Sequence, residues 1–258
     1  MKTPISYYGG KQKMIKHILP LIPEHKTYCE PFFGGGSIYF NKSESQVEII
    51  NDQNNEVINF YKILKNHYNE LEKEIQTSLH SRELHRRAKV IYENPELFDD
   101  IKRAWAFWML TNQGFSNIIG KGWGYDKHGI CTRRIKTKID NFTQDLSKRL
   151  QNTLIECNDA LKIISVYDTP DTFFYCDPPY FNSDCGHYKG YSKQDFTNLL
   201  EQLSKIKGKF LLSSYKSDIL EQFINSNDWT TQKIDMPVSV TFRSKKRKIE
   251  QLTMNYNS

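Results

Sequence analysis

The sequence predicts a doubly wound α/β domain made of two separated segments, residues 1–55 and 151–258, with a mostly helical insertion at residues 56–150. In both outer segments, short apolar runs typical of buried strands alternate with helical patterns. The alternation lapses in the middle of the chain, where helical periodicity dominates. Two of the apolar runs end abruptly in an acidic residue and chain-breaking residues, at the strand ends where open parallel sheets bind ligands.

The bulk properties indicate an ordinary globular protein of 258 residues with a net charge of +6. We expect no signal peptide, because residues 1–20 contain lysines and no uninterrupted apolar core. We expect no membrane association, because no apolar run is long enough to span a bilayer. Five cysteines without a Cys-x-x-Cys pair favour a reducing cytoplasm and no metal site. The positive charge fits a polyanionic partner, although basic solvated surfaces are common.

In the first outer segment we expect an amphipathic helix at residues 14–19, a strand at 28–30, a helix opening at Ser37 and a strand at 46–50. In the insertion we expect helices at residues 57–65, 68–79, 81–92 and 95–111. Trp105, Trp108 and Met109 recur at helical spacing, which favours a core stripe over a base-stacking surface.

The second outer segment predicts strands at residues 153–156, 173–176, 210–213 and 229–234, with helices at 161–166, 193–204 and 217–225. The stretches 238–243 and 251–256 are expected to pair as a terminal antiparallel hairpin. A polar, glycine-containing stretch at residues 182–191 could fold over a substrate.

The strongest single motif is the run Phe-Phe-Tyr-Cys-Asp-Pro-Pro-Tyr-Phe at residues 173–181. Two successive prolines cannot continue a sheet, so Asp177 is expected where the strand stops. The prolines stiffen the loop, which presents the Asp177 carboxylate, the Pro178 carbonyl and the ring of Tyr180 together. A planar group with an NH2, such as a nucleobase, would fit there. An ordinary strand-ending turn is an equal alternative for this motif taken alone.

A second motif is Glu30-Pro31-Phe32-Phe33 followed by three glycines and Ser37, again after a short strand. Glycines allow the backbone to approach a ligand closely. Asp52 ends the next strand, about 20 residues beyond this loop, the spacing of an acid that binds ribose hydroxyls. The alternative is an N-cap of the following helix.

Together, Glu-Pro-Phe-Phe-Gly-Gly-Gly and Asp-Pro-Pro-Tyr resemble the S-adenosylmethionine-dependent amino-methyltransferases, in the motif order of the Dam-like (D12 class) DNA adenine-N6 methyltransferases. The resemblance implies a methyltransferase fold with an inserted target-recognition domain, and S-adenosylmethionine as the cofactor. It implies transfer of a methyl group to N6 of an adenine flipped out of double-stranded DNA. The implied catalytic residues are Asp177, Pro178, Pro179 and Tyr180.

The resemblance extends to cofactor-binding residues: Tyr7, Lys11, Glu30, Pro31, Phe32, Gly34, Gly36, Ser37, Asp52, Asp159 and Asp177. Tyr7 and Lys11 match the family's aromatic-x-Gly-Gly-Lys segment, with a solvated surface lysine as the alternative for Lys11. Helix capping is the alternative for Asp159.

DNA contacts are expected in the insertion and near the C-terminus. A long glycine- and aromatic-rich loop lies within residues 113–125, and its amides and aromatic rings suit base reading. Basic residues are candidates for phosphate contacts, with a solvated face as the alternative. The predicted DNA-binding residues are Gln113, Phe115, Ser116, Asn117, Arg133, Arg134, Lys245, Lys246, Arg247 and Lys248.

Two other functions remain open from the sequence. A cytosine-N4 methyltransferase also acts on an exocyclic amine, although its relatives more often carry Ser in place of Asp177. A non-catalytic DNA-binding protein on the same fold would be expected to have lost the glycine loop or the acid. A restriction endonuclease is a candidate partner, and we expect a monomer or a weak dimer.

Overall fold

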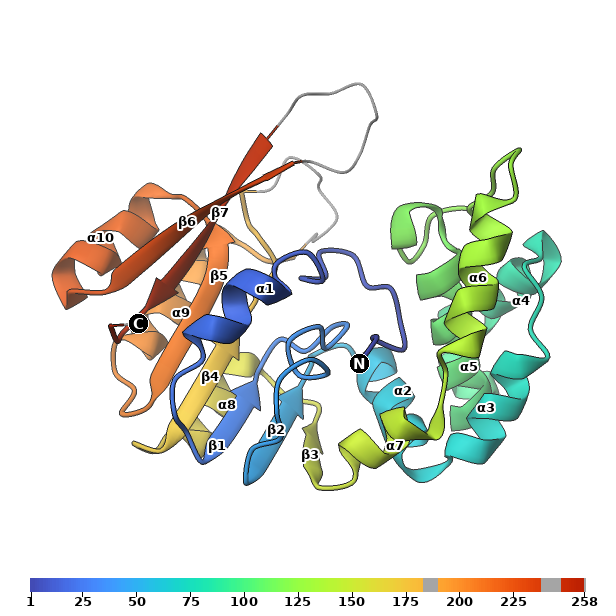
Figure 1. Ribbon diagram of the computed structural model, residues 1–258, viewed down its shortest axis with the longest axis horizontal. Helices are drawn as coiled ribbons and strands as arrows, with labels where there is room; N and C mark the ends of the chain where they lie inside the picture. The colour runs from blue at the N-terminus through green and yellow to red at the C-terminus, as the bar shows by residue number, and fades with distance from the viewer. Residues whose placement is uncertain (183–189, 238–246, 258) are drawn as a thin grey trace. The chain divides into compact units, whose positions relative to one another are not determined.

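The computed structural model describes residues 1–182, 190–237 and 247–257. Its strands are β1 (Thr27–Glu30), β2 (Val47–Asn51), β3 (Thr153–Glu156), β4 (Thr172–Cys176), β5 (Lys209–Tyr215), β6 (Thr230–Pro237) and β7 (Arg247–Met254). They form one seven-stranded sheet in the order β3-β2-β1-β4-β5-β7-β6, drawn in Figure 1. Pairing is parallel from β2 through β1 and β4 to β5, and antiparallel where β7 lies between β5 and β6.

The helices that precede and cross the middle of the chain are α1 (Ile15–Ile18), η1 (Leu19–Leu21), α2 (Asn55–Asn66), α3 (Tyr68–Gln76), α4 (Arg82–Glu93), η2 (Pro95–Leu97), α5 (Asp100–Gln113), η3 (Phe115–Asn117), α6 (Ile130–Asp140) and α7 (Gln144–Leu150). Those of the second outer segment are α8 (Ala160–Tyr167), α9 (Lys193–Leu203) and α10 (Asp218–Asn227). No helix within the described ranges is long and apolar enough to cross a membrane.

The chain divides into two compact units. The sheet unit contains residues 16–33, 44–51 and 158–258, and the helical unit contains residues 1–15, 34–43 and 52–157. The α/β class and the helical middle of the chain are as the sequence indicates. The assignment of residues 56–150 to a separate inserted domain, with boundaries at 55 and 151, stays a prediction.

One face of the sheet unit is packed by α8, α9 and α10, which lie behind the strands in Figure 1. Successive side chains of a strand point to opposite faces, so alternate residues of the apolar runs reach this core. They include Cys29, Phe174, Cys176, Phe210 and Leu212, all buried. The predicted strands are nearly continuous apolar runs because parallel strands are buried on both faces.

The helical unit is built around α5. Trp108 and Met109 are fully buried and Trp105 nearly so, which confirms the predicted core stripe. The single helix predicted at residues 95–111 is wrong, because the chain forms η2 and then begins α5 anew. Phe98 is extended, and the carboxylate of Asp99 caps α5 by accepting the N–H of Lys102 at 2.9 Å.

Two other expectations need correction. Residues 37–41 form consecutive turns, closed by bonds such as Phe40 N–H to Gly36 O at 3.0 Å, and no regular helix opens at Ser37. The terminal hairpin pairs β7 with β6, so the partner of residues 251–254 is residues 230–233. Residues 238–243, predicted as that partner, lie outside the described residues.

Gly208 provides a test of packing in the sheet unit. A Cβ at this position would lie 2.6 Å from the carbonyl oxygen of Thr172 and 2.9 Å from that of Thr169. Because backbone must move to relieve such contacts, we expect Gly208→Ala to lower the free energy of unfolding by roughly 1–3 kcal/mol. Urea denaturation gives the value. Gly122→Ala is the matched control, since a Cβ there would meet no atom within 4 Å; equal stability of the two variants would contradict the packing argument.

Candidate functional site

The Asp-Pro-Pro-Tyr segment begins directly after β4, at the edge of the sheet where the parallel strands end. Pro178 is buried, whereas Asp177 and Tyr180 are half-buried. Tyr180 packs edge-to-face on Tyr215, with ring centroids 4.5 Å apart. The predicted strand end at Asp177 is therefore confirmed, and the segment lies at the ligand-binding edge of a parallel sheet.

The hydroxyl of Tyr180 lies among three oxygen-bearing side chains. Asp177 Oδ1 is 3.3 Å away and Ser213 Oγ is 3.1 Å away. The hydroxyl also bonds Glu250 Oε1, which in turn accepts the Ser213 hydroxyl at 2.7 Å. Burial, followed by the charges of Asp177 and Glu250, raises the pKa of Tyr180 well above its usual value, so the phenol stays protonated.

The loops that follow β1 and β3 are joined by Asn51, a fully buried residue that the sequence reading did not single out. Its amide donates to Pro31 O at 2.9 Å and to Asn158 O at 3.0 Å. Its amide oxygen accepts the N–H of Asn158 at 2.9 Å, and its backbone carbonyl accepts the N–H of Phe33 at 2.8 Å. An Asn directly before Asp52 at a strand end is the only signal the sequence offered.

Two predicted cofactor residues have clear roles in this unit. Glu30 is buried at the end of β1 and accepts the Tyr28 hydroxyl at 2.9 Å. Asp159 caps α8, where its carboxylate accepts the N–H groups of Leu161 at 2.9 Å and Lys162 at 3.1 Å. The capping alternative for Asp159 is thus confirmed, and its contact with a cofactor stays a prediction.

In the helical unit the N-terminal segment lies against the glycine loop. A Cβ on Gly34 would lie 2.9 Å from the Tyr7 ring, and one on Gly35 would lie 3.0 Å from Tyr7 Cβ. Gly34 also has a positive φ of 48°, which side chains rarely adopt. Only glycine therefore allows Tyr7 to cover this loop.

Neighbouring residues complete the contact between these two segments. Gln12 bonds the Ser37 hydroxyl at 3.3 Å. Lys11 is buried, and its ammonium donates to Gly9 O at 3.2 Å, so the alternative of a solvated surface lysine is wrong. The structure thus brings Tyr7 against Gly34 and Gly35, and it brings Gln12, next to Lys11, to Ser37.

Asp52 also contacts the glycine loop, through a hydrogen bond to the backbone of Gly34. Its two carboxylate oxygens accept the N–H of Gly34 and the N–H of Asn54, each at 2.9 Å. Burial raises the pKa of Asp52, and these two backbone bonds partly oppose the shift. The capping alternative is wrong, because Asn54 is the residue whose side chain caps α2.

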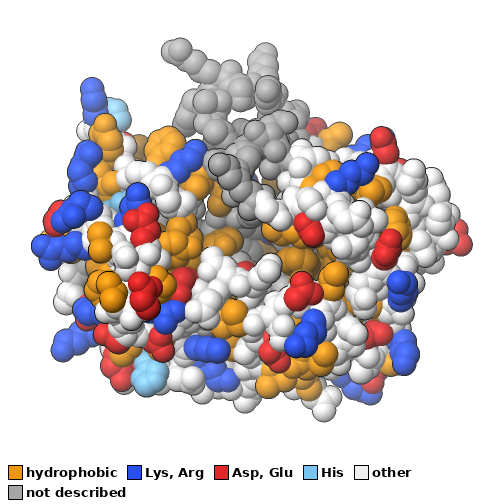
Figure 2. All heavy atoms as spheres, turned by 180° about the vertical axis from the view of Figure 1, so that it is seen from behind, with side chains coloured by type: hydrophobic (Ala, Val, Ile, Leu, Met, Phe, Trp, Pro, Cys, Tyr) orange, Lys and Arg blue, Asp and Glu red, His pale blue; other side chains and the backbone are white. Residues whose placement is uncertain are grey.

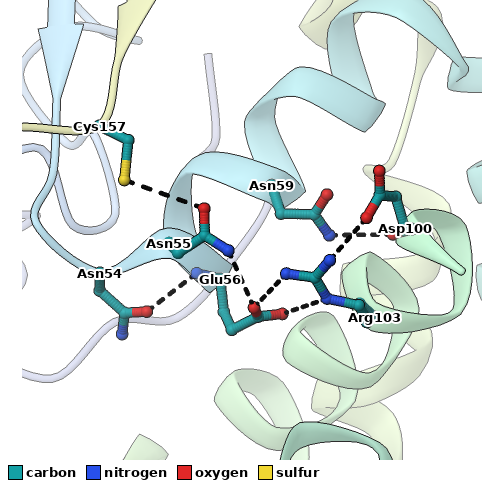
Figure 3. Close-up of polar contacts among 7 residues, drawn as sticks. All are labelled: Asn54, Asn55, Glu56, Asn59, Asp100, Arg103 and Cys157. Carbon is teal, nitrogen blue, oxygen red and sulfur yellow. Dashed lines mark hydrogen bonds and ion pairs between the residues drawn. The ribbon is translucent and has the colours of Figure 1, made fainter. Parts of the chain in front are cut away.

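The start of α2 is fixed by the ion pair drawn in Figure 3. Arg103 of α5 donates to both oxygens of Glu56, at 2.5 and 3.3 Å, and to Asp100 at 2.6 Å. Asn59 donates to the backbone carbonyl of Asp100 at 2.9 Å. These bonds tie the first turns of α2, directly after Asp52, to the first turns of α5.

The predicted DNA-reading loop continues from the end of α5. Gly114 and Trp123 form an antiparallel bridge, and Phe115 N–H donates to Gly122 O at 2.8 Å. Phe115 is 59% exposed at the tip of this loop. Ser116 and Asn117 have positive φ angles of 56° and 57°, and within the described chain the buried Asn117 Oδ1 has no hydrogen-bond partner. Two consecutive non-glycine residues with left-handed backbone angles are strained, and such strain is common in binding loops.

Gln113 lies beneath the loop. It is buried, and its amide donates to Leu79 O at 2.9 Å while its oxygen accepts the N–H of Ser81 at 3.4 Å. Its backbone carbonyl accepts the N–H of Gly124 at 2.8 Å. These bonds fix the shape of the loop, and a direct base contact by Gln113 stays a prediction from the sequence.

A stack of rings that the sequence reading missed supports the same loop. His80 packs on Trp123 with centroids 4.6 Å apart, and Trp123 is stacked on Tyr125 at 5.6 Å. The Arg82 guanidinium lies 5.1 Å from the Trp123 centroid and 5.5 Å from that of Tyr125, within cation–π range. His80 and Trp123 are 43 positions apart, and no local sequence pattern marks such a pair.

Basic side chains gather over the helical unit, at the left of Figure 2. Arg133 and Arg134 are exposed on α6, as are Arg82, Arg86 and Arg87 on α4. Lys245 and Lys246 lie outside the described residues. Arg247 and Lys248 begin β7, but their side chains are not described, so phosphate contacts by these four residues stay predictions.

The fold and these motifs define a class of enzyme. Residues 7–247 match the family D12 class N6 adenine-specific DNA methyltransferase. The chain belongs to this family, and it is an adenine-specific DNA methyltransferase. The cytosine-N4 and non-catalytic alternatives are thereby set aside.

Several named proteins are similar to this chain along most of their length. The Type II methyltransferase M.MjaIII of Methanocaldococcus jannaschii is 27% identical in an alignment of 290 residues. The alignment covers 99% of this chain and 99% of the relative. The Type II methyltransferase M1.LlaDCHI of Lactococcus lactis subsp. cremoris is 26% identical, over 88% of this chain and 85% of its own. The DNA adenine methylase of Salmonella typhi is 24% identical, over 90% and 92%.

Methyltransferases of this kind generally use S-adenosylmethionine. The part of the chain that the structure describes contains no group of three or more His, Cys, Asp or Glu residues arranged to hold a metal.

Asp52 provides a test of cofactor binding. Each carboxylate oxygen has a second lone pair beyond its backbone bond, so Asp52 can still accept ribose hydroxyls. We expect Asp52→Ala to weaken S-adenosylmethionine binding by roughly 1.5–3 kcal/mol, the value of hydrogen bonds to a charged group. Titration calorimetry measures this, with Asp99→Ala as a matched loss of an acid, because Asp99 caps α5 in the same unit and is assigned no cofactor contact. Unchanged affinity in a folded Asp52→Ala protein would refute the ribose role.

Proposed function

We propose that this protein transfers a methyl group from S-adenosylmethionine to N6 of a flipped-out adenine at a specific site in double-stranded DNA. The observation that carries the proposal is Asp177, which directly follows a buried parallel strand and is held by two prolines. A carboxylate there, beside the Pro178 carbonyl and the Tyr180 ring, offers two acceptors and a flat face to an aminopurine.

Asp177 and Pro178 would act by holding the adenine amine in position for methyl transfer. Adenine N6 is a weak nucleophile because its lone pair is delocalised into the ring. Hydrogen bonds from its two N–H groups to Asp177 and to the Pro178 carbonyl would fix the amine and direct the lone pair. The negative charge of Asp177 would oppose the positive charge that develops on nitrogen during transfer.

The cofactor supplies an activated methyl group on a sulfonium when it is bound. The residues fit such a molecule in two respects. The ring of Tyr7 lies against the glycine loop at Gly34 and Gly35, and Asp52 beside this loop can accept hydroxyl groups. We assign cofactor contacts to Tyr7, Lys11, Glu30, Pro31, Phe32, Gly34, Gly36, Ser37, Asp52, Asp159 and Asp177.

Base flipping follows from the location of the amine. N6 of a paired adenine is inaccessible to a carboxylate on a stiff loop, so the base must leave the stack. The Tyr180 ring, half-buried beside Asp177, is the surface on which we expect the flipped base to stack.

Site recognition is assigned to residues 113–125, with the exposed Phe115 and the strained Ser116 and Asn117 at the tip. Arg133 and Arg134 would contact phosphates, which position the protein without reading sequence. Two relatives are Type II methyltransferases by name, so a restriction endonuclease is the partner that we propose. We propose a monomer or weak dimer that works in the cytoplasm.

The reading loop gives a prediction on specificity. A bidentate amide–adenine pair contributes roughly 1–3 kcal/mol of discrimination between bases. We therefore expect Asn117→Ala to relax or abolish the preference for one site and to leave S-adenosylmethionine affinity unchanged. Methylation-sensitive sequencing of DNA from cells that express each variant measures the preference. Lys127→Ala is the control, and an unaltered site preference in Asn117→Ala would place recognition elsewhere, with Arg133 and Arg134 the next residues to change.

Asp177 gives the test of the reaction itself. Asp177→Asn keeps the shape and one acceptor oxygen but removes the charge that stabilises the transition state. We expect the single-turnover rate of methyl transfer to fall about a hundredfold, or on the order of 3 kcal/mol. Asp177→Ala should reduce transfer to near background. Circular dichroism checks folding, and a near wild-type rate in a folded Asp177→Ala protein would eliminate this assignment.

A further inference from the structure

Glu250 is a buried carboxylate that no step of the proposed reaction uses. It lies on β7 with 9% of its surface exposed, and it pairs across the sheet with Tyr215 of β5. One of its oxygens, Oε1, accepts hydrogen bonds from the hydroxyls of Ser213 and Tyr180. A buried charge is costly unless it is hydrogen-bonded, and here two hydroxyls donate to it.

The Tyr180 hydroxyl has more neighbouring acceptors than it has protons to donate. A phenol carries one proton, and three acceptors surround the Tyr180 hydroxyl: Glu250 Oε1, Ser213 Oγ at 3.1 Å and Asp177 Oδ1 at 3.3 Å. Glu250 Oε1 is the nearest of the three. Ser213 directs its own proton to the same Glu250 oxygen, at 2.7 Å. Without Glu250, the remaining charged acceptor for the phenol would be Asp177.

We propose that Glu250 is a positioning residue that holds the Tyr180 phenol proton away from Asp177, so that Asp177 Oδ1 can accept the amino group of the substrate. This inference rests on the proposed function, in which Asp177 accepts a proton of the adenine amine. The same bond fixes the rotation of the Tyr180 ring at the edge of the sheet.

The surroundings of Tyr180 agree with this role. Its pKa is raised by burial and by both carboxylates, so the proton remains on the phenol and must be directed to some acceptor. The pairing of β5 with β7 fixes Glu250 and Ser213 in the same sheet. The Tyr215 ring, packed edge-to-face on Tyr180, keeps the phenol in this polar cluster.

The first experiment is a double-variant cycle measured by single-turnover methyl transfer on an adenine-containing duplex. Glu250→Gln keeps the shape but replaces a charged acceptor by a neutral one, so the phenol proton should turn towards Asp177. We expect about a tenfold loss of rate, corresponding to the loss of one charged hydrogen bond. Tyr180→Phe removes the proton and keeps the ring, and should cost less.

The double variant, Glu250→Gln with Tyr180→Phe, decides the matter. If Glu250 acts by holding the proton, removal of the proton should rescue part of the loss, and the double variant should be faster than Glu250→Gln alone. A double variant as slow as the product of the two single losses would overturn the proposal. Glu48→Gln is the matched control, since it neutralises another buried carboxylate on a strand of the same unit. An equal loss in Glu48→Gln would also overturn it.

A second measurement needs no substrate and therefore separates this inference from the proposed function. The 13Cζ signal of Tyr180, assigned by its absence in Tyr180→Phe, reports the acceptor of the phenol proton. We expect Glu250→Gln to move the signal and Asp177→Asn to leave it in place. The reverse result would place the proton on Asp177 and overturn the inference, whether or not the protein methylates adenine.

Discussion

Parallel pairing of β2, β1, β4 and β5 is the constraint that sets where the Asp-Pro-Pro-Tyr segment lies. Parallel strands end at the same edge of a sheet, so Glu30, Asn51 and Asp177 are delivered to one side of the sheet unit. Because both faces of these strands are buried, most residues between their ends are apolar. Asn51 then satisfies four backbone groups with bonds of 2.8 to 3.0 Å and holds two loops in place at that edge.

The helical unit obeys a different constraint, the close approach of two backbone segments. Tyr7 covers Gly34 and Gly35 at distances that any side chain on those residues would prevent. Asp52 holds Gly34 by its N–H, and the ion pair between Glu56 and Arg103 fixes the helix that follows. The same helix α5 that carries Arg103 ends at Gln113, where the loop of residues 114–125 begins. One buried helix thus both supports the start of α2 and leads into this loop.

The antiparallel hairpin of β6 and β7 supplies a carboxylate, Glu250, to the polar cluster around Tyr180. Insertion of β7 between β5 and β6 brings Glu250 beside Ser213 and the Tyr180 hydroxyl. The tyrosine of the Asp-Pro-Pro-Tyr motif therefore depends on a residue outside the motif, because its hydroxyl bonds a carboxylate 70 residues further along the chain. Membership of the D12 class accounts for the motif, and the position of Glu250 explains how the tyrosine of the motif is oriented.

The sequence by itself determined the α/β class, the strand end at Asp177 and the buried stripe of α5, because apolar periodicity, prolines and glycines act over a few residues. The family followed from the resemblance of its two motifs. It could not determine the break between η2 and α5, where a capping bond from Asp99 outweighs helical periodicity. Nor could it resolve the alternatives for Lys11, Asp52 and Asp159, since each depends on which backbone groups come within bonding distance. Glu250, Asn51 and the His80–Trp123 stack were decided only by the tertiary structure, because their partners are distant in the chain and no local pattern encodes them.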